Sequence, residues 1–327
     1  MLAIHGGAGS KLPGVDRLCS DAIKKWRNDP VQCVVHLEND PLVNCGFGSS
    51  LTVNGRVECE AGYMCSEKHA FGAVGAVSNT RHPVLAAKYL ATKYLSESMF
   101  ALIPPQVVVG TGADLLVSEL NLPSVGNSEL KSALAIKGFE NAKKAMEELN
   151  PADTQMEEKM DTVGSVYVSE NGRAEACVSS GGIVLKHDGR LGHSTMFGSA
   201  IWAEERDSRS ISISVSGCGE VLTRLHFAEA LANFVFLSSD NDMLPCIVSK
   251  FFREAFISSP IISHFPMERR IVGGLIILRQ GRMQELVAFH NSSKFSFAFW
   301  NGKSVKHYCS ELEHGAPFIC NSFVANF

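Results

Sequence analysis

The sequence predicts an α+β fold in which two β-sheets are covered by helices. Strand-like runs come in pairs joined by turn residues, and helical patterns are grouped between these pairs. A parallel α/β fold would instead alternate one strand with one helix along the chain. The 327 residues are 45% hydrophobic and 20% charged, which is typical of a globular protein with a sizeable core.

The first half of the chain predicts more helix than strand. A short apolar strand at 2–4 leads into a glycine-rich turn, and apolar residues at three- and four-residue spacing mark the helices that follow. The expected helices are 15–27, 30–38, 84–95, 113–120 and 129–149, and the expected strands are 57–64 and 71–77. Residues 150–161 lack apolar periodicity, so we expect an exposed, cleavable linker there.

The second half is richer in strands. It opens with a hairpin whose strands are 163–168 and 174–179, because Asn171-Gly172 between them is a strong two-residue turn signal. The other expected strands are 195–203, 210–216, 271–279, 283–290, 295–301 and 305–309, and the expected helices are 220–236 and 243–256. No internal repeat is visible in either half.

Composition argues against several classes of function. The net charge of −4 disfavours a broadly basic surface that would bind nucleic acid directly. No apolar run approaches the ~18–20 residues of a membrane helix. Ten cysteines form no Cys-x-x-Cys pair or zinc-spaced cluster, so we expect reduced thiols, no metal and no cofactor. The first strand leaves no room for a signal peptide, and we expect an intracellular protein of the cytoplasm, the nucleus or both.

The tetrapeptide Asp161-Thr162-Val163-Gly164 lies between a charge-rich segment and the first strand of the hairpin. Cleavage of the Asp161–Thr162 bond would make Thr162 an N-terminal nucleophile, and its own α-amine could then take the hydroxyl proton. The alternative is that Asp and Thr merely mark a junction between loop and strand, as they often do.

Four other short motifs combine glycines with polar side chains. Glycines let backbone N–H groups approach a ligand closely, although each motif alone could equally be a turn. The first motif carries no Gly-x-Gly-x-x-Gly pattern or Walker-type lysine, which makes a phosphate site a weak interpretation. The motifs are His5-Gly6-Gly7-Ala8-Gly9, Ser179-Ser180-Gly181-Gly182, Gly189-Arg190-Leu191-Gly192-His193 and Ser216-Gly217-Cys218-Gly219-Glu220.

In this order, the motifs make the chain resemble the plant-type asparaginases, a family of N-terminal nucleophile hydrolases. Within that family it is most similar to the threonine aspartases, or taspases, which are endopeptidases. Further segments extend the resemblance across nearly the whole chain. They are Leu37-Glu38-Asn39-Asp40-Pro41, Asn44-Cys45-Gly46-Phe47-Gly48-Ser49, Glu58-Cys59-Glu60-Ala61, Phe71-Gly72-Ala73-Val74-Gly75-Ala76, Ile103-Pro104-Pro105, Lys186-His187 and Phe256-Ile257-Ser258-Ser259-Pro260.

The resemblance implies an αββα sandwich and a precursor that cuts itself before Thr162. One catalytic domain, 1–327, would then consist of an α subunit, 1–161, and a β subunit, 162–327, held together as a heterodimer that could dimerise further. Protein substrates cleaved after Asp are implied, with nuclear regulatory proteins among them.

The resemblance also implies roles for site residues. Thr162 would be the nucleophile, Ser180 would bind near its amine and hydroxyl, and Ser216 and Gly217 would line the oxyanion side. Arg190 would grip a substrate carboxylate. Three sets of residues complete the implied site: Asn44 from the α subunit, Gly219 beside the substrate, and Gly7 and Gly9 in the glycine loop.

His193 departs from the small-molecule asparaginases, which have an Asp three positions after the arginine to hold the substrate ammonium. In free asparagine, and in a peptide cut after Asp, the carboxylate carbon lies three bonds from the attacked carbonyl. Arg190 could therefore serve both substrates through a bidentate pair. Only free asparagine and isoaspartyl peptides carry an ammonium at the position that this Asp binds. The loss of the carboxylate at His193 therefore favours a substrate with an internal Asp. The alternative is that His193 is a surface histidine with no role.

Three other interpretations stay open at this point. The first is an L-asparaginase or isoaspartyl peptidase that acts on small molecules. The second is a catalytically silent member that only binds partners, and the third is catalysis by Ser180 or Ser216 with His187 or His193 as base.

Overall fold

The computed structural model describes residues 1–9, 12–95, 103–148, 161–239, 242–313 and 315–326. Its strands form an eight-stranded sheet in the order β12-β11-β1-β5-β6-β2-β3-β4 and a five-stranded sheet in the order β13-β10-β9-β8-β7. Neighbouring strands are antiparallel except for the parallel pair β3 and β4. The bounds are β1 Leu2–Ala8, β2 Cys59–Cys65, β3 Phe71–Val77, β4 Val107–Val109, β5 Val163–Val168, β6 Ala174–Ser180, β7 Ile201–Arg206, β8 Arg209–Gly217, β9 Val272–Gln280, β10 Met283–His290, β11 Lys294–Trp300, β12 Val305–Glu311 and β13 Ile319–Asn326.

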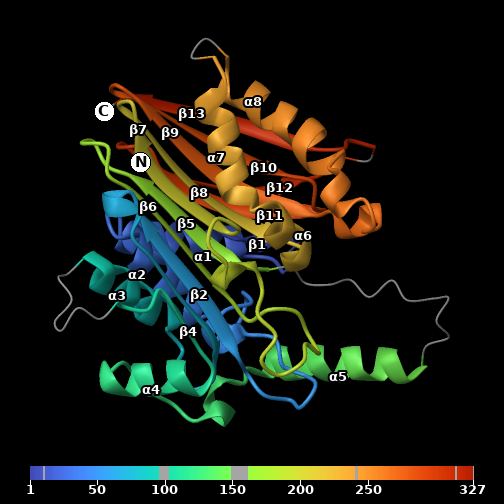
Figure 1. Ribbon diagram of the computed structural model, residues 1–327. Coiled ribbons are helices and arrows are strands. Elements are labelled where there is room, and N and C mark those ends of the chain that lie inside the picture. Colours follow the sequence, from blue (N-terminus) through green and yellow to red (C-terminus); the bar gives the residue numbers. More distant parts are fainter. Residues whose placement is uncertain (10–11, 96–102, 149–160, 240–241, 314, 327) are drawn as a thin grey trace.

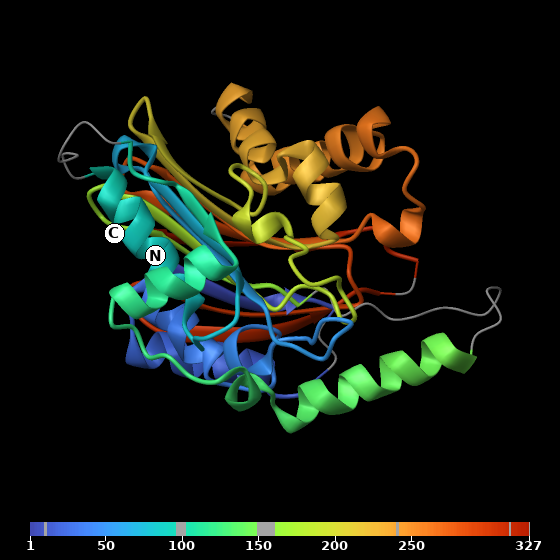
Figure 2. The same cartoon turned by 60° about the horizontal axis from the view of Figure 1, so that its bottom comes forward.

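The two sheets pack face to face, and each is covered by helices on its outer side (Figures 1 and 2). Helices α1 (Val15–Lys25), α2 (Pro30–Glu38) and α3 (Pro83–Leu95) cover the larger sheet, whereas α6 (Gly219–Leu225), α7 (Phe227–Leu237) and α8 (Leu244–Phe251) cover the smaller one. One apolar cluster fills the space between the sheets and under α6–α8, and a second lies under α1–α3. The expected αββα sandwich is therefore confirmed.

Most elements follow the local sequence. Asp29 caps α2 by accepting the N–H groups of Val31 and Gln32, and Pro30 supplies the fixed φ that suits a first helical position. The predicted helix 30–38 and the strands 71–77 and 283–290 are confirmed to the residue. The hairpin at 163–168 is also confirmed, with Gly172 in the left-handed region of its turn.

Several expectations were wrong. The helix 220–236 is broken at His226, whose positive φ of 45° ends α6 and begins α7. Residues 195–200 form turns, because the N–H groups of Met196 and Ser199 bond to carbonyls three residues earlier, so β7 begins only at Ile201. Strands β4 and β13 were not predicted.

Three other helices also have bounds that differ from expectation. Segment 129–149 divides into a 3₁₀ turn at Asn127–Leu130 and helix α5 at Ala133–Glu148, while α4 covers Thr111–Glu119. The helix 243–256 is α8 continued by a π-helical segment, Phe252–Ile257. The predicted linker falls almost wholly on 149–160, outside the described residues. Across the described ranges, every helix is too short or too polar to cross a membrane.

Candidate active site

Thr162 and Ser180 meet where β5 begins and β6 ends. Val163 pairs with Ser179 in the antiparallel ladder, so the residues one step beyond that pair are neighbours. The Thr162 hydroxyl donates to Ser180 Oγ at 3.1 Å, and the N–H of Gly182 donates to the same oxygen at 3.0 Å. Thr162 is only 4% exposed. Ser180 therefore orients the candidate nucleophile within a buried site.

The glycine loop at the end of β1 packs against the bond that is expected to be cut. Gly7 has φ of 103°, and a Cβ there would lie 2.5 Å from Asp161 Cα and 2.7 Å from its carbonyl carbon. Gly9 has a similar φ of 96°, but a Cβ there would meet no atom within 4 Å. Of the two predicted loop glycines, the structure thus brings Gly7 to the site and leaves Gly9 outside it.

Residues at the end of β8 form another wall. Gly217 and Gly219 line the same small pocket as Thr162. Ser216 is fully buried, and its Oγ accepts the N–H of Ala8 at 3.1 Å, which ties β8 to the glycine loop. This contact supports the loop that carries Gly7.

Arg190 is held by Glu220, the first-turn carboxylate of α6. Arg190 Nε and Nη2 donate to Glu220 Oε1 at 3.0 and 2.7 Å, with the arginine side chain 16% exposed and the glutamate side chain 50% exposed. Burial alone would raise the pKa of Glu220, but the charge and hydrogen bonds of Arg190 outweigh it and lower that pKa below its usual value. The guanidinium is therefore oriented by an ionised partner.

His193 lies inside the site and is only 3% exposed, so the interpretation as a surface histidine was wrong. Its Nε2 lies 3.2 Å from the carbonyl oxygen of Val215, and because a carbonyl can only accept, this nitrogen carries the proton. Burial lowers the pKa of His193, although the nearby Glu60 opposes the shift. Beside Arg190, the pocket thus presents a neutral imidazole.

Asn44 links the first half of the chain to this site. Its Nδ2 donates to the carbonyl of Gly182 at 2.7 Å, its Oδ1 accepts the N–H of Ser50 at 2.8 Å, and its own carbonyl accepts the N–H of Gly181 at 2.8 Å. These bonds hold the turn that follows Ser180, and Asn44 lines the same pocket as Thr162.

Two glutamates that sequence reasoning did not assign to the site hold the loop of Arg190 and His193. Glu58 Oε2 accepts the N–H of Gly189 at 2.7 Å, and Glu60 Oε2 accepts the N–H of Gly192 at 2.5 Å. Both glutamates are buried. The sequence does contain a sign of this role, namely two carboxylates at alternate positions beside an apolar strand. Charged groups are rarely buried without a partner, so such carboxylates are expected to bind a specific group.

The pocket gathers most of the predicted residues but is nearly closed, with a volume of about 10 Å³. In the part of the chain that the structure describes, no group of His, Cys, Asp and Glu side chains could hold a metal ion. His187 is exposed, and the Ser180 hydroxyl is engaged by Thr162 and Gly182, which disfavours a Ser180–His187 pair. The pocket residues are Asn44, Glu60, Asp161, Thr162, Ser180, Gly182, Ile183, Arg190, His193, Gly217 and Gly219.

Comparisons with known proteins agree with this geometry. A family profile described as asparaginase matches residues 23–240. Mouse isoaspartyl peptidase/L-asparaginase is 28% identical over 243 residues, which cover 70% of each chain. Plant-type L-asparaginase of Pyrobaculum calidifontis is 30% identical, over 68% of this chain and 75% of the relative. Isoaspartyl peptidase of Salmonella typhimurium is 31% identical, over the same shares.

The profile spans well over half of the chain and includes the pocket residues from Asn44 to Gly219. The fold has the two stacked sheets and the outer helices that N-terminal nucleophile hydrolases share. The chain therefore belongs to the asparaginase family of N-terminal nucleophile hydrolases.

Proposed function

We propose that this chain is a self-processing threonine endopeptidase that cleaves protein substrates after Asp. The observation that carries the proposal is the pair formed by Arg190 and the neutral, buried His193 in one pocket with Thr162. Arg190 suits the side-chain carboxylate of an Asp residue. His193 offers no negative charge to the ammonium of a free amino acid, whereas the amide nitrogen of an internal Asp needs none.

Processing begins with attack of Thr162 Oγ on the carbonyl carbon of Asp161. The C–N bond of the Asp161–Thr162 peptide breaks, its nitrogen takes the hydroxyl proton, and an ester links the two residues. Water then hydrolyses the ester, which leaves a carboxylate on Asp161 and restores the Thr162 hydroxyl. The freed α-amine becomes the base for later turnovers, and Ser180 keeps the hydroxyl oriented.

Each turnover on a substrate repeats this chemistry with the amine as base. The amine takes the hydroxyl proton as Oγ attacks the main-chain carbonyl carbon of the substrate Asp, and it returns the proton to the departing amine. Backbone N–H groups near Gly217 and Gly219 are the candidate donors to the developing oxyanion. Water releases the acyl group and regenerates the enzyme.

The second candidate is a plant-type L-asparaginase or isoaspartyl peptidase. The specific observation in its favour is that the three relatives carry these names, which supports it more directly than they support an endopeptidase. Arg190 fits the α-carboxylate of the small substrates equally well. The two candidates therefore differ at His193, which by the resemblance occupies the position of the Asp that holds the substrate ammonium in the small-molecule asparaginases.

Rates on matched substrates separate the two candidates. The purified, processed protein is given L-asparagine, a β-aspartyl dipeptide, a decapeptide with one internal Asp, and the same decapeptide with Asn. We expect the highest kcat/KM on the Asp decapeptide. Rapid hydrolysis of the two small substrates without cleavage of the decapeptide establishes the second candidate instead.

A substitution at His193 directly tests the observation on which the proposal rests, the neutral imidazole beside Arg190. His193→Asp restores a carboxylate beside Arg190, and we expect kcat/KM on L-asparagine to rise at least roughly tenfold, the effect of about 1.4 kcal/mol. His193→Asn, which removes the ring without adding charge, is the matched control. Self-processing of both variants, followed by intact mass, shows that they fold. An unchanged rate on L-asparagine in the Asp variant contradicts the role given to His193.

A further inference from the structure

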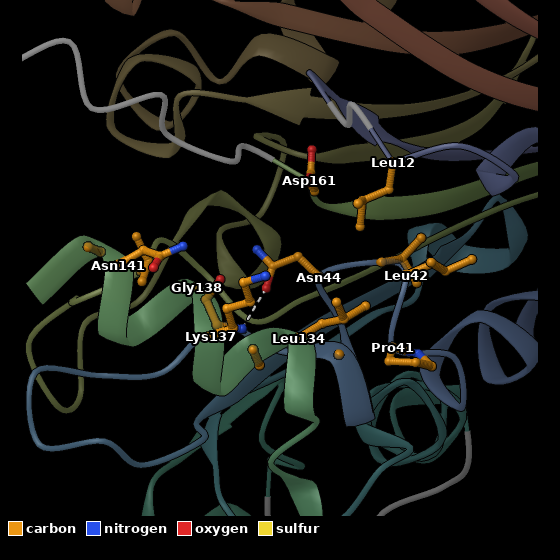
Figure 3. A pocket seen from close by; sticks show the side chains of 15 residues that line it. Leu12, Pro41, Leu42, Asn44, Leu134, Lys137, Gly138, Asn141 and Asp161 are labelled. Carbon is orange, nitrogen blue, oxygen red and sulfur yellow. Dashed lines mark hydrogen bonds between the residues drawn. The ribbon is translucent and has the colours of Figure 1, made fainter. Parts of the chain in front are cut away.

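A second, larger cavity of about 550 Å³ adjoins the catalytic pocket. Helix α5 forms one side of it, and the loop after α2 forms another (Figure 3). Its volume is within the range of pockets that bind drug-sized ligands and is far more than a free asparagine needs. We call this cavity the α5 groove; it is lined by Leu12, Pro41, Leu42, Val43, Asn44, Gly48, Ser50, Leu134, Ala135, Lys137, Gly138, Asn141, Ala142, Asp161 and Val184.

The α5 groove and the catalytic pocket share part of their walls. Asn44 and Asp161 line both cavities. Asp161 is the residue that precedes the bond expected to be cut, so the N-terminal side of that bond borders the groove. Figure 3 shows Asn44 and Asp161 among the side chains that line the groove.

Three of the six residues by which helix α5 lines the groove are small, which leaves room beside the helix. Ala135, Gly138 and Ala142 line the groove at three- and four-residue spacing, which places them on one face. A Cβ added at Gly138 would meet no atom within 4 Å. None of the sixteen residues of α5 is buried, although Ala135 and Phe139 pack against the small cluster that includes Leu51 and Leu130.

The lining has the chemistry of a site for extended polypeptide. Leu42, Val184 and Leu134 offer apolar surface, while the amide of Asn141 can bond to the backbone groups that an extended chain leaves unpaired. Lys137 is the cationic side chain at this wall. A protein substrate needs such a surface beside its cleaved bond, and a single amino acid does not.

We propose that the α5 groove binds the residues of a polypeptide substrate that precede the cleaved Asp. The inference rests on the proposed endopeptidase function. It adds the surface that would select substrate residues other than the Asp itself. It makes α5, which belongs to the segment before Thr162, part of the substrate-binding surface of the processed enzyme.

The test compares peptides of different length. Three N-acetylated peptides carry one, three or five residues before a single Asp and an identical sequence after it. In the wild-type enzyme we expect kcat/KM to rise by roughly tenfold or more from the shortest to the longest peptide, since apolar side chains become buried. Gly138→Trp fills the groove with a bulky ring, and we expect it to remove most of this rise.

Lys143→Trp is the matched control, because it adds the same ring to α5 at an exposed position outside the groove lining. It should keep the full dependence on peptide length, and complete self-processing shows that both variants fold. Cleavage of all three peptides at equal rates contradicts the proposed role of the groove but not the proposed endopeptidase activity. An equal loss in both tryptophan variants also contradicts that role, whereas hydrolysis of L-asparagine with no peptide cleavage overturns the proposed function itself.

Discussion

Arg190 Nε and Nη2 both donate to a single carboxylate oxygen of Glu220, at 3.0 and 2.7 Å. Glu220 therefore fixes the plane of the guanidinium from the side of α6. Nη1 lies on the side of Gly182 and Gly192, whose added Cβ atoms would be 3.4 and 3.0 Å from it. Glu220 thus holds Nε and Nη2, while Nη1 lies near Gly182, a residue that lines the catalytic pocket.

Under the proposed function, we expect Arg190 to determine the preference for Asp at the cleaved position. Removing a charged partner from a desolvated pocket typically costs about 2–5 kcal/mol, or roughly 30- to 5,000-fold in kcat/KM. We expect Arg190→Ala to lose this much on an Asp peptide, and Arg190→Lys to lose part of it, because lysine keeps the charge but not the fork. Steady-state rates check this, and wild-type cleavage after Asn as fast as after Asp contradicts it.

Self-processing should require the Thr162 hydroxyl. Thr162→Ala is expected to stay intact at full mass and to be inactive, whereas Thr162→Ser should process slowly because its hydroxyl survives. Intact mass after purification checks both variants. Wild-type fragments that begin at Thr162 exclude a silent binding protein, and processing of the alanine variant at this bond rules out the mechanism.

Gly7 and Gly9 should respond differently to the same substitution. Both have a positive φ, so an alanine strains the backbone at either site. Only at Gly7 would the new Cβ also press on Asp161, 2.5 Å from its Cα. We expect Gly7→Ala to slow self-processing by at least roughly tenfold relative to Gly9→Ala, as followed by gel densitometry over time. Equal rates would show that strain, and not the contact with Asp161, matters.

Glu60 should act by positioning the loop that carries Arg190 and His193. Glu60→Gln weakens a charge-assisted hydrogen bond to the N–H of Gly192, and such bonds contribute about 1.5–3 kcal/mol. We expect KM for an Asp peptide to rise roughly tenfold while kcat changes little, because Thr162 itself is undisturbed. The exposed Glu67 provides the control Glu67→Gln. A fall in kcat at constant KM would point to a merely destabilised fold.

Acid should destabilise the protein through His5. This side chain is fully buried and bonded to Ser214 through Nε2 at 2.9 Å, and burial, assisted by His193, lowers its pKa from 6.5 to about 3. Its folded-state pKa is thus below the unfolded value. The stability it contributes is complete above about pH 6.5 and is lost as the pH falls toward 3, by up to about 1.4 kcal/mol per unit.

Melting temperatures at pH 7, 6 and 5 test this, in the uncut Thr162→Ala background so that processing does not interfere. We expect His5→Gln, which keeps a donor to Ser214, to lose less on acidification than the parent chain. His187→Gln, at an exposed position, serves as the control. If the His5→Gln variant loses as much stability on acidification as its parent, His5 is not the cause of the acid sensitivity.

Much of the fold and the identity of the site motifs could be predicted from the sequence. The hairpin after Thr162 and helix α2 are encoded locally, by a turn dipeptide and by a capping residue followed by proline. The strands β4 and β13 escaped prediction, since one is only three residues long and the other lies at the edge of its sheet, where its sequence carries little apolar alternation.

What the sequence determined by itself was the set of chemical groups: a threonine after an aspartate, an arginine, and glycines that allow close backbone approach. Only the tertiary structure decided how these groups meet, because several contacts that build the site join residues more than a hundred positions apart. Gly7 lies against Asp161, and Glu60 holds the loop of His193. Such contacts arise from the packing of two sheets, so they cannot be predicted from any local pattern of residues.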